Sequence, residues 1–159
     1  MSIFGDVDIA SIPDDGFKIE PDWYRAVIVK AGYNENEQTG HESLKLEWTI
    51  DDPESDYHGW SLFDNLLTPR GMLQDELEDK KLKFRLSFLK KRLRRGLDLS
   101  EEEMVTANPS DLVSKVAYVK VVNTVDRDDE DTTYNNIRDA LSERLYEEKF
   151  GNVEATMGL

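Results

Sequence analysis

Residues 43–50 read SLKLEWTI, and this stretch decides the fold class because its apolar residues alternate with polar ones. Leu44, Leu46, Trp48 and Ile50 occupy every second position. A period of two places these four side chains on one face of a strand, so the stretch predicts a half-buried strand with Trp48 in the core. The chain is therefore expected to build its core on β-structure.

Strand signals extend outward from this stretch in both directions. β-Branched and aromatic residues are enriched in four further segments, and Gly, Pro, Asn and Asp cluster between them. Such segments are typical of strands bounded by turns. The segment before SLKLEWTI is expected to pair with it as a hairpin across the polar loop 34–42. The four additional strands are predicted at 23–33, 58–67, 111–125 and 133–138.

A helical insert is expected between the third and fourth strands. Four leucines between residues 71 and 96 recur at intervals of four, three and four, which is one stripe of a helix. Ser100 and Glu103 have the spacing of a capping box and predict a second, short helix that ends near residue 107. A terminal helix is predicted over 139–150. The stripe consists of Leu82, Leu86, Leu89 and Leu93.

Three strands, a helical insert and two further strands are the layout of the OB-fold, a five-stranded, partly open Greek-key barrel. A split β-sandwich is the alternative, but five strands are too few to bury two sheets well. We therefore expect a mainly β protein with a five-stranded OB-fold barrel over 22–138. An extended arm at 1–21, with weak anchors at Phe4 and Phe17, would precede it. A C-terminal helix and frayed tail would follow at 139–159.

Charge is strongly segregated along the chain. Nine of the 20 basic residues lie in residues 80–95, where no acid occurs. The net charge is nevertheless −14, because the rest of the chain carries 11 basic and 34 acidic residues. A concentrated basic helix can attract phosphate even in an acidic protein.

The sequence lacks the residues that several classes of function require. The chain has no cysteine, so disulfides and thiolate metal sites are excluded. His41 and His58 stand in no metal-binding spacing, and no glycine-rich phosphate loop is present. No apolar run approaches a membrane span, and the N-terminal residues do not resemble a signal peptide. We expect a non-enzymatic cytoplasmic protein without cofactor or metal.

Aromatic and basic residues on the strands and the helix are the candidate binding residues. Rings can stack on unpaired bases, and Lys and Arg can pair with phosphates. Trp60, after the turn at Gly59, is the best stacking candidate, and the main site is expected around Lys45, Trp60 and Tyr118. The basic helix is expected either to extend the path of a bound DNA strand beyond this site or to form an oligomer contact. The candidates are Arg25, Lys30, Tyr33, Lys45, Trp60, Phe63, Lys115, Tyr118, Lys120, Tyr134 and Arg138, with Lys90, Lys91, Arg92, Arg94 and Arg95 of the helix.

Four stretches of the chain share a pattern of apolar spacing and turns: WYRAVIVKAGYNENEQTGHESLKLEWTI (23–50), HGWSLFDNL (58–66), FLKKRLRRGLDL (88–99) and DLVSKVAYVKVVNTVDRDDEDTTYNNI (111–137). On these stretches the sequence resembles a group of small bacteriophage proteins long catalogued as a domain of unknown function, some of which are described as single-stranded DNA-binding proteins. Trp23 and Ser114 stand where that pattern has glycine. The resemblance implies an OB-fold protein that binds single-stranded DNA during phage replication or recombination in the host cell.

Two functional hypotheses remain open at this point. The first is sequence-independent binding of single-stranded DNA, with replication or recombination proteins as further partners. The second is an acidic protein-binding adaptor, or a DNA mimic, that uses the strongly acidic remainder of the chain to engage a host or phage enzyme. Homo-oligomerisation is open under both hypotheses.

Overall fold

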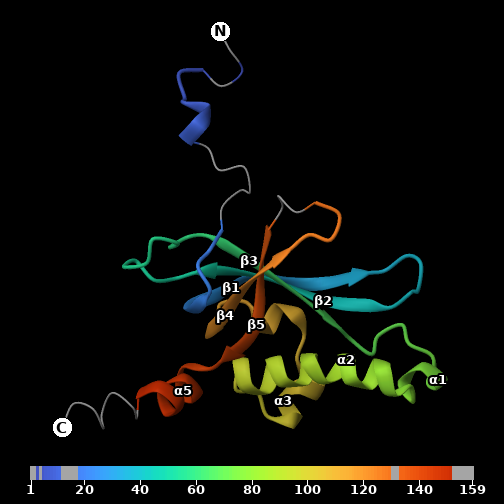
Figure 1. Ribbon diagram of the computed structural model, residues 1–159. Helices are drawn as coiled ribbons and strands as arrows, with labels where there is room; N and C mark the ends of the chain where they lie inside the picture. The colour runs from blue at the N-terminus through green and yellow to red at the C-terminus, as the bar shows by residue number, and fades with distance from the viewer. Residues whose placement is uncertain (1–2, 4, 12–17, 130–132, 152–159) are drawn as a thin grey trace.

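A five-stranded antiparallel sheet forms the body of the protein (Figure 1). The structure, a computed structural model, describes residues 3, 5–11, 18–129 and 133–151. Pairing runs in the order β3-β2-β1-β4-β5 and stops at β3 and β5, so the sheet is not closed. The predicted mainly β architecture is confirmed. The strands are β1 (Asp22–Glu35), β2 (Glu42–Ile50), β3 (Ser61–Leu67), β4 (Val116–Val125) and β5 (Thr133–Leu141).

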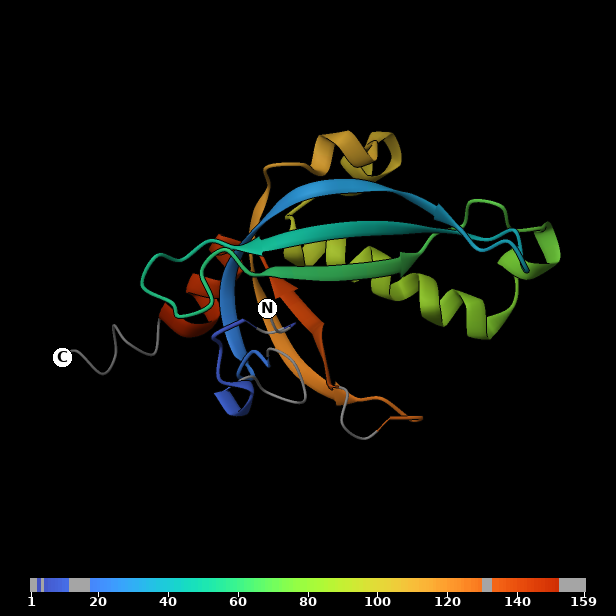
Figure 2. The same cartoon turned by 90° about the horizontal axis from the view of Figure 1, so that it is seen from above.

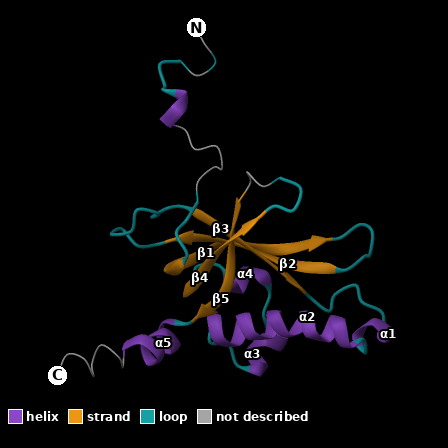
Figure 3. Ribbon diagram, in the orientation of Figure 1, coloured by secondary structure: helices purple, strands orange, loops and turns teal. Residues whose placement is uncertain are grey.

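Helices lie between β3 and β4 and after β5 (Figure 3). The longest, α2, packs against β3 and continues into a π-helical turn, η2, that packs against β5. Figure 2 shows α2 running alongside β3. No helix in the described part of the chain is long and apolar enough to cross a membrane. The helical segments are η1 (Ile9–Ser11), α1 (Gln74–Leu77), α2 (Lys80–Lys91), η2 (Arg92–Gly96), α3 (Glu101–Thr106), α4 (Pro109–Leu112), α5 (Glu143–Tyr146) and η3 (Glu147–Gly151).

Two predicted elements have different bounds from those expected. The helix predicted over 71–96 is divided, because Asp79 caps a new helix by accepting from the amides of Lys81 and Leu82. The strand predicted from 111 begins only at Val116, because Pro109 starts the short helix α4. Between α4 and β4, Ser114 has a φ of 76°, which lies in the left-handed region that favours glycine.

The ends of the chain were only partly predicted. β5 runs on to Leu141, so the terminal helix begins at Glu143 instead of 139. The suggested anchors Phe4 and Phe17, and the tail 152–159, lie outside the described residues. Within the described part of the arm, Ile19 is fully buried; its backbone bonds the side chains of Asn135 and Asn123.

The core lies on one face of the curved sheet. Trp48, Leu46, Ile28 and Val119 are fully buried there, which confirms Trp48 as a core residue. Alternation then places the intervening residues on the opposite, outer face of the sheet. Strand register makes this outer face continuous from β3 to β4. On one side of β1, Gly32 pairs with Lys45 of β2, and on the other side Trp23 pairs with Lys120 of β4.

The opening between β3 and β5 is bridged by one side chain. Arg92 Nε donates to Asp64 Oδ2 of β3 at 2.8 Å, and Arg92 Nη2 donates to the carbonyl of Ile137 in β5 at 3.4 Å. Both charged side chains are buried, and this burial raises the pKa of Asp64. A charged link therefore stands where a closed barrel would have a ladder of backbone hydrogen bonds.

Candidate nucleic-acid interface

A cleft of about 330 Å³ forms where the end of α2 and η2 meet β4, β5 and the C-terminal helical turn. Six of the nine residues that line it are Lys or Arg, and only one is acidic. We call this cleft the basic groove. Its lining residues are Trp23, Phe88, Lys91, Arg92, Arg95, Lys120, Arg138, Asp139 and Lys149.

Local structure explains how the groove is assembled. Phe88, Lys91 and Arg95 follow one another at helical spacing, so they share one face of the helix. Lys120 lies between the buried residues Val119 and Val121, and therefore points from the outer face of β4. The register then sets Lys120 between Trp23 of β1 and Asp139 of β5.

The basic groove carries more positive charge than the neighbouring acidic side chains neutralise. Arg92 is paired with Asp64, and Arg95 lies 3.6 Å from Asp139. The other cations of the groove form no ion pair within the described part of the chain; they are Lys91, Lys120, Arg138 and Lys149. A concave site with several unneutralised cations concentrates positive potential and attracts anions.

The groove continues along α2. A neighbouring cleft of about 330 Å³, between α2 and the opening of the sheet, shares Phe88, Arg92 and Arg138 with it and adds Arg85. A smaller cleft of about 240 Å³ follows, which shares Arg85 with the second and reaches the loop between β1 and β2. The three clefts together line a path from β1 to the far end of β3.

A second hollow lies on the outer face of β1, β2 and β3. It measures about 350 Å³ and brings together Lys30, Tyr33, Lys45 and Phe63, four of the predicted residues. The Phe63 side chain is 54% exposed, and Lys45 Nζ lies 5.8 Å from its ring centre. Gly32 also lines the hollow, and a Cβ there would meet no atom within 4 Å.

Trp60, the best predicted stacking residue, does not stand on an open face. It is half-buried and packs against the core, with its ring centre 5.1 Å from that of Tyr57. Tyr118 is stacked on Tyr146 of the C-terminal helix, and Lys45 lies beside Phe63. The expected site around Lys45, Trp60 and Tyr118 is thus divided among three separate clusters, because these side chains face different neighbours.

Other predicted residues are engaged in structural contacts. Arg92 is buried in the link between β3 and β5, so its assignment to a DNA contact is corrected to a structural role. Arg25 pairs with Asp51 and Glu143, and Lys90 with Glu101. Lys115 lies close enough to Glu103 to lower the pKa of that carboxyl, after the larger effect of hydrogen bonds from Ser100.

Two predicted residues are exposed but lie outside the clefts described above. The Tyr134 hydroxyl donates to Asp126 Oδ2 at 2.8 Å, and this carboxylate raises the pKa of the phenol. Arg94 is exposed and forms no ion pair with the described residues. Neither side chain adds to the charge of the basic groove.

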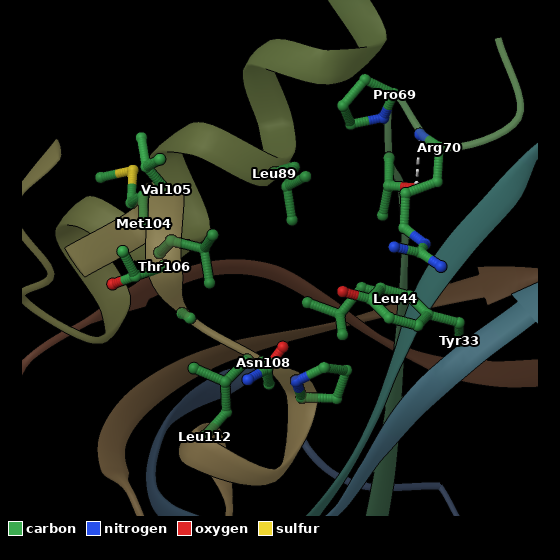
Figure 4. Close-up of a pocket in the computed structure, with 14 residues that line it drawn as sticks. Tyr33, Leu44, Pro69, Arg70, Leu89, Met104, Val105, Thr106, Asn108 and Leu112 are labelled. Atoms are coloured by element: carbon green, nitrogen blue, oxygen red, sulfur yellow. Dashed lines mark hydrogen bonds between the residues drawn. The ribbon is translucent and has the colours of Figure 1, made fainter. Parts of the chain in front are cut away.

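A further cavity has a different character. It measures about 360 Å³, lies among β2, α2, α3 and α4, and is largely apolar (Figure 4). Its one cation, Arg70, is paired with Glu42, and its guanidinium lies 4.1 Å from the ring centre of Tyr33. The cavity therefore offers no unneutralised cation for a phosphate.

The sequence-based prediction missed Trp23, Arg85, Phe88 and Lys149. A signal existed for the helix: Phe84 and Phe88 stand four residues apart, off the leucine stripe, within the run without acids. Trp23 and Lys149 join the groove only through strand register and C-terminal packing, which no local pattern encodes. No group of three or more acidic or histidine side chains among the described residues is placed to hold a metal ion.

Comparison with known proteins identified no relative. No protein-family model and no curated protein sequence matches the chain. Functional inference therefore rests on the geometry and charge of the clefts described above.

Proposed function

We propose that this protein binds single-stranded DNA without sequence preference and has no catalytic activity. The observation that carries the proposal is the basic groove. Cations from α2, η2, β4, β5 and η3 converge there, in a protein whose net charge is −14. Such convergence against the overall charge favours a polyanionic ligand.

The ligand is proposed to be single-stranded because aromatic rings accompany the cations. Trp23 and Phe88 line the basic groove, and Phe63 stands exposed beside Lys45 on the outer face. An unpaired base offers its face to a ring without the cost of unstacking a duplex, and each stacked base contributes about 1–3 kcal/mol regardless of its identity. Phosphates would follow the cations along α2 while bases stack on the rings.

We further propose that the sheet is an OB-fold barrel left open between β3 and β5. The strand order supports this, because β1 pairs with both β2 and β4, as a barrel of this topology requires. The link from Arg92 to Asp64 and Ile137 supports it as well, since it joins the two strands that a closed barrel would pair. In this proposal α2 packs along the opening and becomes part of the binding surface.

A biological role follows from this proposal together with the resemblance to phage proteins. The protein would cover exposed strands during phage replication or recombination in the cytoplasm of the host. Replication or recombination proteins would be its further partners.

Salt dependence of binding tests the proposed function. Titration of tryptophan fluorescence with oligo-dT should show binding that weakens as salt rises. If the four unpaired cations of the groove each contact one phosphate, log K should fall with log salt at a slope of about −3. Absence of binding even at low salt would contradict the proposal.

A pair of matched variants locates the site. Lys91→Glu with Lys120→Glu reverses two charges in the basic groove and should weaken binding at least about tenfold. Lys80→Glu with Lys81→Glu makes the same change in charge at the start of α2, outside the groove, and should weaken it far less. Equal losses from the two pairs would mean that DNA follows only the general charge of the protein, without using the groove.

A further inference from the structure

Four aromatic rings gather beside the basic groove. Trp23 and Tyr118 come from the outer faces of β1 and β4, whereas Tyr146 and Phe150 come from the C-terminal helix formed by α5 and η3. The rings of Tyr118 and Tyr146 are parallel within 7°, with centres 3.8 Å apart. Trp23 meets Tyr146 and Phe150 edge to face at 6.1 and 5.8 Å.

The parallel pair has the geometry that a nucleobase adopts on an aromatic side chain. A flat ring lies face to face on Tyr118 at stacking distance, and the Trp23 ring bounds the same space at a steep angle. Both strand residues are only half-buried, although the helix covers them. The surface under the C-terminal helix is therefore suited to any flat aromatic ring of this size.

We propose that Trp23 and Tyr118 form a stacking site for an unpaired base, and that Tyr146 and Phe150 occupy this site until DNA binds. This inference rests on the proposed function, because it assigns a further site to the same ligand. A base would replace Tyr146 on Tyr118, and the C-terminal helix would move away from the sheet.

The contacts that hold the C-terminal helix make this exchange feasible. The helix is a single α-helical turn followed by a π-helical turn, and none of its residues is buried. Short helices have little stability of their own. Ion pairs from Glu143 to Arg25 and from Arg144 to Asp98 anchor it, but all of these side chains are at least one-third exposed. Exposed pairs of this kind contribute little.

The site also lies where a bound strand would bring its bases. Trp23 and Lys149 both line the basic groove, so the covering helix forms one wall of it. Lys149 Nζ lies 5.7 Å from the Trp23 ring, and movement of the helix would withdraw this cation while it opens the groove toward β1. A phosphate contact would thus be exchanged for a stacked base. Three unpaired cations would then stay on phosphates, and the slope of log K against log salt would be about −2 instead of −3.

Hydrogen exchange of the full-length protein tests the inference without any substitution. Amides of residues 143–151 should exchange faster when oligo-dT is bound, since the helix leaves its site. Unchanged or slower exchange with bound DNA would overturn the inference and leave the proposed function intact. Failure of oligo-dT to bind at all would remove both.

Substitutions provide a second, independent test by fluorescence titration with oligo-dT. Tyr146→Ala removes the competing ring and should tighten binding about threefold to tenfold, whereas Tyr118→Ala should weaken it by a similar factor. Adding Tyr146→Ala to Tyr118→Ala should then bring no gain, because the site itself is lost. Leu73→Ala, which removes an exposed apolar side chain outside the groove, is the control and should leave binding unchanged. Unchanged or weaker binding by Tyr146→Ala would overturn the inference.

Discussion

The outer face of the sheet has two halves that carry the same kinds of residue but differ in what covers them. On β1, β2 and β3, Phe63 and Lys45 stand open to solvent around the hollow at Gly32. On β1 and β4, Tyr118 lies near Lys120 in the same alternation, but the C-terminal helix covers it. We call these the open half and the covered half.

The difference between the halves is made by a segment far away in sequence. Phe63 and Tyr118 both alternate with buried residues of their strands, so local pattern does not distinguish them. Only Tyr146 and Phe150, placed by the turn at Ser142, decide that one ring is stacked and the other exposed. Availability of a ring for binding is therefore a tertiary property.

Loss of the link from Arg92 to β3 and β5 should have the largest effect on stability, because both halves of the sheet depend on the contact between these two edge strands. Asp64→Ala leaves Arg92 buried without its carboxylate, and should lower the free energy of unfolding by about 3–5 kcal/mol. Asp139→Ala removes the partner of Arg95, which is more exposed than Asp64. It should lower the free energy of unfolding by at most about 1 kcal/mol. Urea denaturation measures both. Equal losses would mean that Arg92 does not join the strands.

A substitution at Gly32 should change the open half alone. Gly32 has no left-handed φ, and a Cβ there meets no atom within 4 Å, so Gly32→Thr should raise the free energy of unfolding by about 0.5–1 kcal/mol. If DNA uses the open half, the added side chain should also weaken oligo-dT binding about threefold, by filling the hollow between Lys45 and Phe63. Unchanged affinity in the stabilised variant would exclude the open half from the DNA path.

Acid should act on the covered half alone, and with the smallest effect. Hydrogen bonds from Arg144 lower the pKa of Asp98. A lowered pKa in the folded state means that the pair stabilises the C-terminal helix above the ordinary aspartate pKa and is lost as pH falls through the lowered value. NMR shifts of the stacked Tyr118 and Tyr146 rings should then move toward those of free tyrosine. In Asp98→Asn this acid transition should vanish; if it persists there, another group controls the helix.

Sequence patterns predicted the strands because each strand depends on local signals, alternation in 43–50 and β-branched and aromatic content in the others. Leu44 to Ile50 and the capping box from Ser100 to Glu103 are local signals, and both are confirmed. The break at Asp79 was missed because leucines stand on both sides of it, at Leu77 and Leu82, whereas its side chain caps the second helix. Ser114 shows a different limit, since its left-handed φ follows from the junction between α4 and β4.

The candidate site was predicted in composition more than in arrangement. Lys91, Arg95 and Lys120 were expected to bind and do converge in the basic groove, together with Arg138. Trp60 was expected to be the best stacking residue, but it is half-buried and packs against Tyr57, because an aromatic residue after a turn can equally well pack inward. Pairing of β1 with β4, which brings Trp23 beside Lys120, joins segments too distant for any periodicity to relate.

The central position of β1 also has a consequence for synthesis of the chain. β1 pairs with β2 as soon as the hairpin emerges, but its other edge must wait for β4. At about 5–20 residues per second, the roughly 80 residues between Glu35 and Val116 take about 4–16 s to translate. During that interval the nascent chain presents an unpaired, largely apolar strand edge, which is a template for pairing with other chains. The speed of translation through residues 36–115 thus sets how long each new molecule is exposed to misassembly.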